Sequence, residues 1–209
     1  SNLCLWGKKS HDKCFLCSSR GTLLHVLSGC STSLEQGRYT YRHNLIIKHL
    51  ASFLKDKINQ QSLPLKVFAD LHGHTIEGGT IPSIVIPTSE KPDMCIFDPA
   101  SKIINIIELT VPFESNIDKA RAYKSDKYEV LVSDIENNGF QCNLICLEIG
   151  ARGLISENNK KQIRTIAKIV NERRVRELWR KLSELAMIGS FVIFKAQYDQ
   201  AWKDSSDFM

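Results

Sequence analysis

The sequence lacks any apolar run that approaches the ~20 residues needed to cross a bilayer, and its first residues lack the basic start and apolar stretch of a signal peptide. We therefore expect a soluble protein that is not secreted and has no membrane partner. It also lacks an initiator methionine, so we expect a piece of a longer protein. Repeats and low-complexity segments are absent too, and 209 residues of 43% hydrophobic content suit one sizeable domain plus a small appendage.

An even set of cysteines is also missing, because the chain contains seven. Several of them, Cys95, Cys142 and Cys146, lie in apolar runs that look like strands. A reduced cysteine behaves as a small hydrophobic residue in such a run. The pattern therefore favours a reducing, intracellular compartment over a disulfide framework.

The net charge of +5 is modest, but it is unevenly placed. Between residues 159 and 181, nine lysines and arginines are opposed only by Glu172 and Glu177, which gives that segment a charge of +7. Such a run is typical either of a solvated helix face or of a surface that binds a polyanion. On the second interpretation, Arg173, Arg174 and Arg176 are candidate DNA-binding residues.

A metal-binding pattern stands near the N-terminus. Cys14, Cys17, His25 and Cys30 have the spacing C-x2-C-x7-H-x4-C, in which a short turn presents two thiolates and a following helical turn supplies the other two ligands. This spacing predicts a closed, structural Zn²⁺ site. Cys4 is a possible substitute ligand, and the alternative is a set of reduced cysteines in a loop-rich segment.

The hydrophobic periodicity predicts the order helix, strand, strand, strand, helix, strand, helix. The expected elements are a helix beginning at Thr40, strands at 65–71, 94–97 and 102–111, a helix from Ser115 to about residue 131, a strand at 140–150, and basic helices at the end. His72 and His74 lie in the loop after the first strand and read as ordinary loop residues. Together these elements predict an α+β fold.

Two acidic residues interrupt the apolar strands of the predicted hairpin. A turn at residues 98–101 would place Phe97 opposite Lys102. Asp93 and Glu108 then project from the same face, one diagonal step apart, with backbones roughly 7 to 8 Å from each other. Two carboxylates at that separation can hold one Mg²⁺ or Mn²⁺ ion between them.

The helix that follows the hairpin directs lysines toward the same place. At about 100° per residue, its inward stripe consists of Ile117, Ala120, Lys124, Lys127, Tyr128 and Leu131. Two acids, a cation site and an inward ammonium are the parts needed to hydrolyse a phosphodiester. Tyr128 could hydrogen-bond the attacking water or a phosphate. The alternative is that the lysines extend to the rim or form a structural salt bridge.

These residues resemble a known set. The stretch "KPDMCIFDPASKIINIIELTVPFE", followed by "KSDKYEVL", resembles the restriction-like endonuclease domain of site-specific non-LTR retrotransposons, a branch of the PD-(D/E)xK nucleases. The upstream "CFLC…HVLSGC" zinc knuckle, the "YRHN" helix start and the downstream "EIGARG" occur in the same order in that family. The resemblance covers nearly the whole chain.

The resemblance implies a PD-(D/E)xK core of order αβββαβ, with a mixed central sheet flanked by helices, at residues 38–209, after a zinc knuckle at residues 1–37. Thr110 stands where the wider superfamily has its lysine. The resemblance therefore assigns that role to Lys124 first and Lys127 second, with Tyr128 assisting. Arg42 and His43 match the family's basic pair, which would hold a phosphate or support the site.

The implied activity is a nick in target double-stranded DNA that primes reverse transcription. The implied partners are the element RNA and the reverse transcriptase domain of the same polyprotein, and the implied location is the nucleus. Two alternatives remain open: a non-cleaving, zinc-containing nucleic-acid binding module, and a zinc-dependent interaction module that binds no nucleic acid.

Overall fold

The computed structural model describes residues 12–202, which fold around a mixed four-stranded sheet of order β1-β2-β3-β4. The described elements are η1 (His25–Gly29), α2 (Ser31–Glu35), α3 (Arg38–Gln61), β1 (Lys66–Ala69), β2 (Met94–Asp98), β3 (Ile103–Thr110), η2 (Glu114–Asn116), α4 (Ile117–Asn137), β4 (Gln141–Glu148), α5 (Glu157–Ile169), α6 (Val175–Lys195) and η3 (Ala196–Tyr198). The predicted order of the main elements and the α+β class are confirmed.

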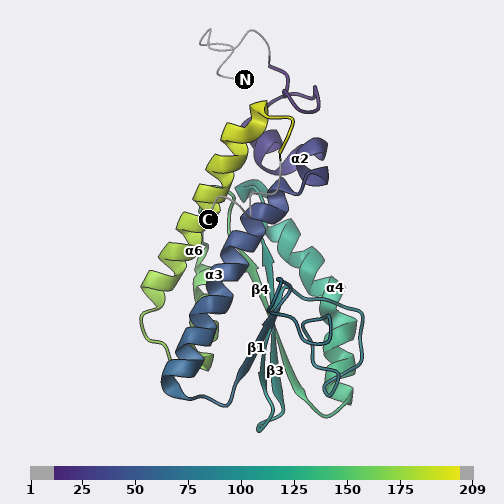
Figure 1. Ribbon diagram of the computed structural model, residues 1–209, viewed down its shortest axis with the longest axis vertical. Coiled ribbons are helices and arrows are strands. Elements are labelled where there is room, and N and C mark those ends of the chain that lie inside the picture. The colour runs from purple at the N-terminus through teal and green to yellow at the C-terminus, as the bar shows by residue number, and fades with distance from the viewer. Residues whose placement is uncertain (1–11, 203–209) are drawn as a thin grey trace.

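Helices cover both faces of this sheet. Figure 1 shows α3 and α6 side by side over one face and α4 over the other. Strand side chains alternate between the faces, so Ile107 and Leu109 of β3 pack in the core shared with α3, α5 and α6, whereas Ile104 and Ile106 pack in the core beneath α4. Polar residues placed on the α4 side of β3 therefore face α4.

The hairpin between β2 and β3 has a different register from the one expected. Phe97 pairs with Ile104, not with Lys102, and the last pair before the turn is Asp98 with Ile103. The carboxylate of Asp98 accepts the backbone N–H groups of the next turn residues, at 3.0 and 3.2 Å. This arrangement keeps Asp98 in the strand and moves the loop one residue further along the chain.

Two predicted helix starts are wrong. α3 begins at Arg38, not at Thr40, because Gly37 adopts a left-handed conformation with φ of 71° that turns the chain into the helix. α4 begins at Ile117 after a short 3-10 turn, and Ser115 makes no capping hydrogen bond to its backbone. α4 also ends later than expected, at Asn137 and not near residue 131.

The N-terminal segment packs directly on the rest of the fold. Val26 and Leu27 of η1 share a buried apolar cluster with Ala151 and with Ile193 of α6. The proposed boundary at residue 37 therefore separates two parts that touch each other. Among residues 12–202, no helix is both long enough and apolar enough to span a membrane.

Candidate active site and zinc cluster

Asp93 and Glu108 meet at the end of the hairpin. Since Met94 pairs with Ile107, the next step along both strands sets Asp93 directly opposite Glu108, closer than the expected diagonal. Glu108 Oε2 accepts the N–H of Asp93 at 3.1 Å, and Asp93 Oδ2 accepts the N–H of Leu109 at 2.7 Å. The expected shared face is thus confirmed, and each carboxylate takes the place of a backbone acceptor on the opposite strand.

His43 of α3 adds a cationic partner to Asp93. Its Nε2 lies 3.0 Å from Asp93 Oδ2. Burial by itself lowers the pKa of His43, but the hydrogen bond and the charge of Asp93 outweigh it and raise the pKa above the ordinary histidine value. Both contacts of Asp93 fall on Oδ2, so Oδ1 has no hydrogen-bond partner among the described residues. That oxygen is the one open to a ligand.

Lys124 of α4 forms an ion pair with Oε1 of Glu108. Glu108 is buried, with 1% of its surface exposed. Burial raises the pKa of Glu108 above its usual range and the charge of Asp93 adds to this effect, while Lys124 opposes both. Lys124 thus lies in the place that the helical stripe predicts, beside the second acid.

The expectation that both lysines point inward is wrong for Lys127. Its side chain is 39% exposed and lies 3.7 Å from Glu90, and its Nζ donates to the hydroxyl of Tyr128 at 3.0 Å. Tyr128 takes the inward position instead, and its ring is fully buried in the core beneath α4. Burial and the nearby carboxylates raise the pKa of the Tyr128 phenol, which therefore keeps its proton.

A pocket of about 400 Å³ opens in front of Asp93. Its polar wall includes Thr40, His43, Asn44, Asp70 and Asp93. Asp70 is a pocket residue that sequence reasoning missed. It follows β1, and its N–H donates to the carbonyl of Asp93 at 2.9 Å. The missing signal was the pairing of β1 with β2, which brings a second acid to the pocket beside Asp93, whereas Glu108 does not line it.

Arg42 supports the site and does not offer its guanidinium to a phosphate. The side chain is buried, and it donates to Leu27 O at 3.0 Å, to Ser190 Oγ at 2.9 Å and to Val111 O at 2.8 Å. Burial lowers its pKa to about 10. Gly189 of α6 leaves room for it, because a Cβ there would lie 2.7 Å from Arg42 Cγ. Of the two roles that the resemblance implies for Arg42, these contacts fit support of the site rather than the holding of a phosphate.

The four predicted zinc ligands converge. The ligand atoms of Cys14, Cys17, His25 and Cys30 all lie within 4.8 Å of one another. Cys14 Sγ and Cys30 Sγ are 4.0 Å apart, close to the roughly 3.8 Å that two Zn–S bonds of about 2.3 Å span in a tetrahedron. This cluster can hold a metal ion such as zinc. Cys4, the possible substitute, lies outside the described residues.

The π-helix η1 explains how His25 and Cys30 reach one ion. Residues five apart in an α-helix point about 140° away from each other, because each residue turns the chain by about 100°. The wider π turn, closed by i to i+5 hydrogen bonds, brings them toward one side. The backbone N–H of Cys30 donates to Tyr39 of α3 at 2.9 Å, which fixes the cluster against the long helix.

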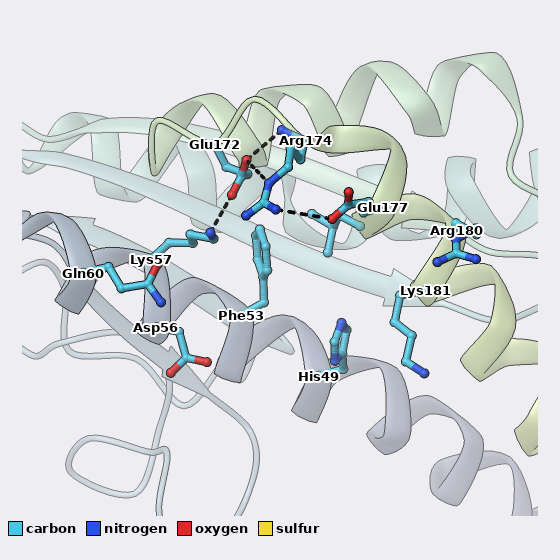
Figure 2. A pocket seen from close by; sticks show the side chains of 11 residues that line it. His49, Phe53, Asp56, Lys57, Gln60, Glu172, Arg174, Glu177, Arg180 and Lys181 are labelled. Atoms are coloured by element: carbon cyan, nitrogen blue, oxygen red, sulfur yellow. Dashed lines mark hydrogen bonds and ion pairs between the residues drawn. The ribbon is translucent and has the colours of Figure 1, made fainter.

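The predicted basic DNA contacts lie away from the acids. Arg173 and Arg174 are in the connection between α5 and α6 and Arg176 is in the first turn of α6, and all three are exposed. Figure 2 shows Arg174 between Glu172 and Glu177, in a pocket of about 530 Å³ that also contains Lys57. Lys57 is fourteen residues from His43 along α3, about 20 Å at 1.5 Å per residue.

Comparisons with known proteins do not assign a family. No protein-family model matches the chain, and no curated protein matches it in sequence. The functional conclusion therefore depends on the geometry of the site.

Proposed function

We propose that this protein is a divalent-metal-dependent endodeoxyribonuclease of the PD-(D/E)xK type, which nicks target DNA to prime reverse transcription. The observation that carries the proposal is the convergence of Asp93, which directly precedes β2, with Glu108 of β3 and Lys124 of α4. Of the three, Asp93 lines an open pocket. The element order and the zinc-sized cluster at the N-terminus support it.

The acids fit a hard divalent cation. Carboxylate oxygens are the ligands that Mg²⁺ and Mn²⁺ prefer, and Asp93 Oδ1 is free of other hydrogen bonds among the described residues. A bound cation would polarise a phosphoryl oxygen and lower the pKa of water at the site. Asp93 and Glu108 are the residues that would hold it.

Residues around the proposed cation site orient the carboxylates and stabilise charge. The backbone N–H of Leu109 and the ring of His43 both contact Oδ2 of Asp93, which leaves Oδ1 available to a cation. Lys124 opposes the rise that burial causes in the pKa of Glu108, and its ammonium can neutralise the charge that develops on phosphorus. Tyr128 remains a neutral hydroxyl behind the site, where Lys127 is its partner.

The decisive experiment is a plasmid-nicking assay with Mg²⁺ or Mn²⁺. Asp93→Asn and Glu108→Gln keep the shape of each side chain, and each should reduce nicking by about 100-fold or more while DNA binding stays within a few-fold. Asp126→Asn is the matched control, because Asp126 is an exposed acid on α4, and it should nick like the original protein. Unchanged nicking in both site variants would rule out this site.

One observation favours a second function. Each acid already has a cationic partner, His43 for Asp93 and Lys124 for Glu108, as expected in a non-cleaving nucleic-acid binding module whose charges only hold the fold together. Binding of DNA with no nicking in either metal would establish that alternative. Little binding even at low salt would favour a zinc-dependent module that binds no nucleic acid.

A further inference from the structure

A second carboxylate and cation pair lies next to Glu108 and Lys124. In the parallel pairing of β3 with β4, Glu108 is opposite Cys146 and Thr110 is opposite Glu148. Glu148 is therefore two residues further along the neighbouring strand, on the face that carries Glu108. Its Oε2 accepts two hydrogen bonds from Arg121 of α4, from Nε at 3.0 Å and from Nη2 at 2.8 Å.

Glu148 is held in place from its backbone. β4 is an edge strand, and the side chain of Asn159 pairs with the outward groups of Glu148: Oδ1 accepts its N–H at 2.9 Å, and Nδ2 donates to its carbonyl at 2.7 Å. Asn159 is fully buried and is itself bound to Ser156, the N-cap of α5. A carboxylate this firmly placed fixes the direction of the arginine it binds.

The ion pair between Glu148 and Arg121 leaves one carboxylate oxygen of Glu148 without a hydrogen bond from the residues that the structure describes. Oε1 of Glu148 is buried and has no hydrogen-bond partner among the described residues, and the same is true of Oγ1 of Thr110, its register partner. Both guanidinium contacts fall on Oε2. Arginine and carboxylate pairs frequently use both oxygens in a fork geometry, and here one oxygen of Glu148 remains without a partner within residues 12–202.

Arg121 turns its remaining nitrogen outward. The side chain is 32% exposed, and Nη1 lies 3.7 Å from Asp118, whose side chain is 98% exposed. An ion pair so open to water contributes little and is readily exchanged. Arg121 and Lys124 are three residues apart on α4, so both cations lie on one helix face, one turn apart.

The four charges act on one another across Cys146. Cys146 is the register partner of Glu108 and stands two residues before Glu148 in β4, so it separates the two pairs. Of the two cations, Arg121 is the more exposed, with 32% of its side chain accessible against 22% for Lys124.

We propose that Arg121, positioned by Glu148, is a phosphate-binding residue that takes a backbone phosphate of the nucleic acid next to the one held at Asp93 and Glu108. The assignment of the neighbouring position rests on the proposed nuclease function. A guanidinium suits this role because two of its nitrogens can be anchored on a carboxylate while the third binds a phosphate oxygen. Asp118 gives way to the stronger ligand.

The test measures the affinity of the full chain for a short DNA duplex as a function of salt, by fluorescence anisotropy without divalent metal. Arg121→Gln should weaken binding and reduce the slope of log affinity against log salt by about 0.9, the contribution of one phosphate contact. Arg121→Lys should restore the slope, because it restores the charge. Lys119→Gln is the control: it removes an exposed charge from the same helix, about 200° around the axis, and should leave the slope unchanged.

Glu148→Gln tests the positioning role and also serves if Arg121→Gln fails to fold. It retains an oxygen for Arg121 but removes a negative charge. Loss of a negative charge by itself strengthens DNA binding, so binding that becomes a few-fold weaker would reflect an arginine that has lost its anchor. Unchanged slopes in Arg121→Gln, or tighter binding in Glu148→Gln, would overturn the proposal.

The two proposals can fail separately, because this assay requires no cleavage. If Arg121→Gln loses the phosphate contact while no form of the protein nicks DNA, the phosphate site stands and the nuclease function falls. If nicking depends on Asp93 and Glu108 but Arg121→Gln leaves the slope of log affinity against log salt unchanged, the nuclease function stands and the phosphate site falls. In a nicking protein, Arg121→Gln should raise KM with little change in kcat.

Discussion

Arg42 joins three segments that are far apart in the chain. It binds the carbonyl of Leu27 beside the Cys/His cluster, that of Val111 after β3, and the hydroxyl of Ser190 on α6. A buried acceptor left without its donor costs about 1 to 3 kcal/mol. The side chain therefore holds the knuckle, the sheet and the last long helix in one arrangement.

We predict that Arg42→Lys lowers the free energy of unfolding by about 3 kcal/mol, as measured by urea denaturation, because a single ammonium cannot replace three directed hydrogen bonds. Arg152→Lys is the control, because Arg152 has an exposed side chain paired with Glu114, and it should change stability by less than about 0.5 kcal/mol. Equal effects of the two substitutions would show that Arg42 does not link these segments.

The positions of Asp93 and Glu108 could be predicted from the sequence in part. The strand period of two fixes which side chains share a face, so the common face of the two acids could be predicted although the register was two positions off. The turn could not be predicted, because it depends on the carboxylate of Asp98 accepting two N–H groups. An odd-numbered error would have separated the acids.

At the level of elements, the connection between α5 and α6 is held by Glu172. It bonds to Lys57 of α3 at 2.7 Å and accepts the N–H of Arg174 at 2.6 Å. The hydrogen bond from Lys57 and the backbone N–H groups lower the pKa of Glu172 from 4.5 to about 2. A depressed pKa means that the folded state favours the ionised form.

The stabilisation by Glu172 should therefore be present above pH 4.5, the ordinary glutamate value, and be lost as the pH falls toward 2. We predict that Glu172→Gln costs about 1 to 2 kcal/mol at pH 7 and that this difference shrinks across that window, as measured by urea denaturation at each pH. Glu177→Gln is the control, since its side chain is 68% exposed. A cost independent of pH would contradict the assignment.

The first residues of α3 and α4 could not be predicted from the sequence. The apolar stripe of α3 is visible in the sequence, but its first turn is set by Gly37 and by Arg38, which is buried and binds the carbonyls of Ala196 and Asp199 near the other end of the chain. A local pattern contains no information about such distant acceptors. Periodicity therefore predicts the middle of a helix better than its ends.

At the scale of the whole molecule, the Cys/His cluster and the α+β body touch but differ in what stabilises them. The body has two large apolar cores. The segment from residue 12 to residue 30 has few buried apolar side chains, such as Val26 and Leu27, and small metal-binding units of this kind unfold without their ion.

We predict that a chelator, or Cys17→Ala, removes zinc and makes the backbone amides of residues 14–30 exchange rapidly, while the helical circular dichroism of the body is retained. Hydrogen exchange with mass spectrometry and zinc analysis would measure both effects. Cys142→Ala is the control, because Cys142 lies in β4 away from the cluster, and it should retain its zinc. Loss of the whole fold would show that the boundary at residue 37 is misplaced.

Long-range pairing sets the limit on predicting the site. Asp93, Glu108 and Lys124 lie in consecutive elements, so their convergence follows from a hairpin and one helix. Asp70 and Glu148 join them only through the pairing of β1 with β2 and of β3 with β4. The connections between those strands, a long loop in the first case and helix α4 in the second, are too long for spacing to give a register.

The amide of Asn159 has one more consequence. By pairing with both outward backbone groups of Glu148, it occupies the position that a fifth strand would need at this end of β4. Open sheet margins are templates for self-association and fibril growth. Here a single side chain takes the hydrogen bonds that a neighbouring strand would make. The backbone of Glu148 is therefore not available for pairing with the strand of another molecule.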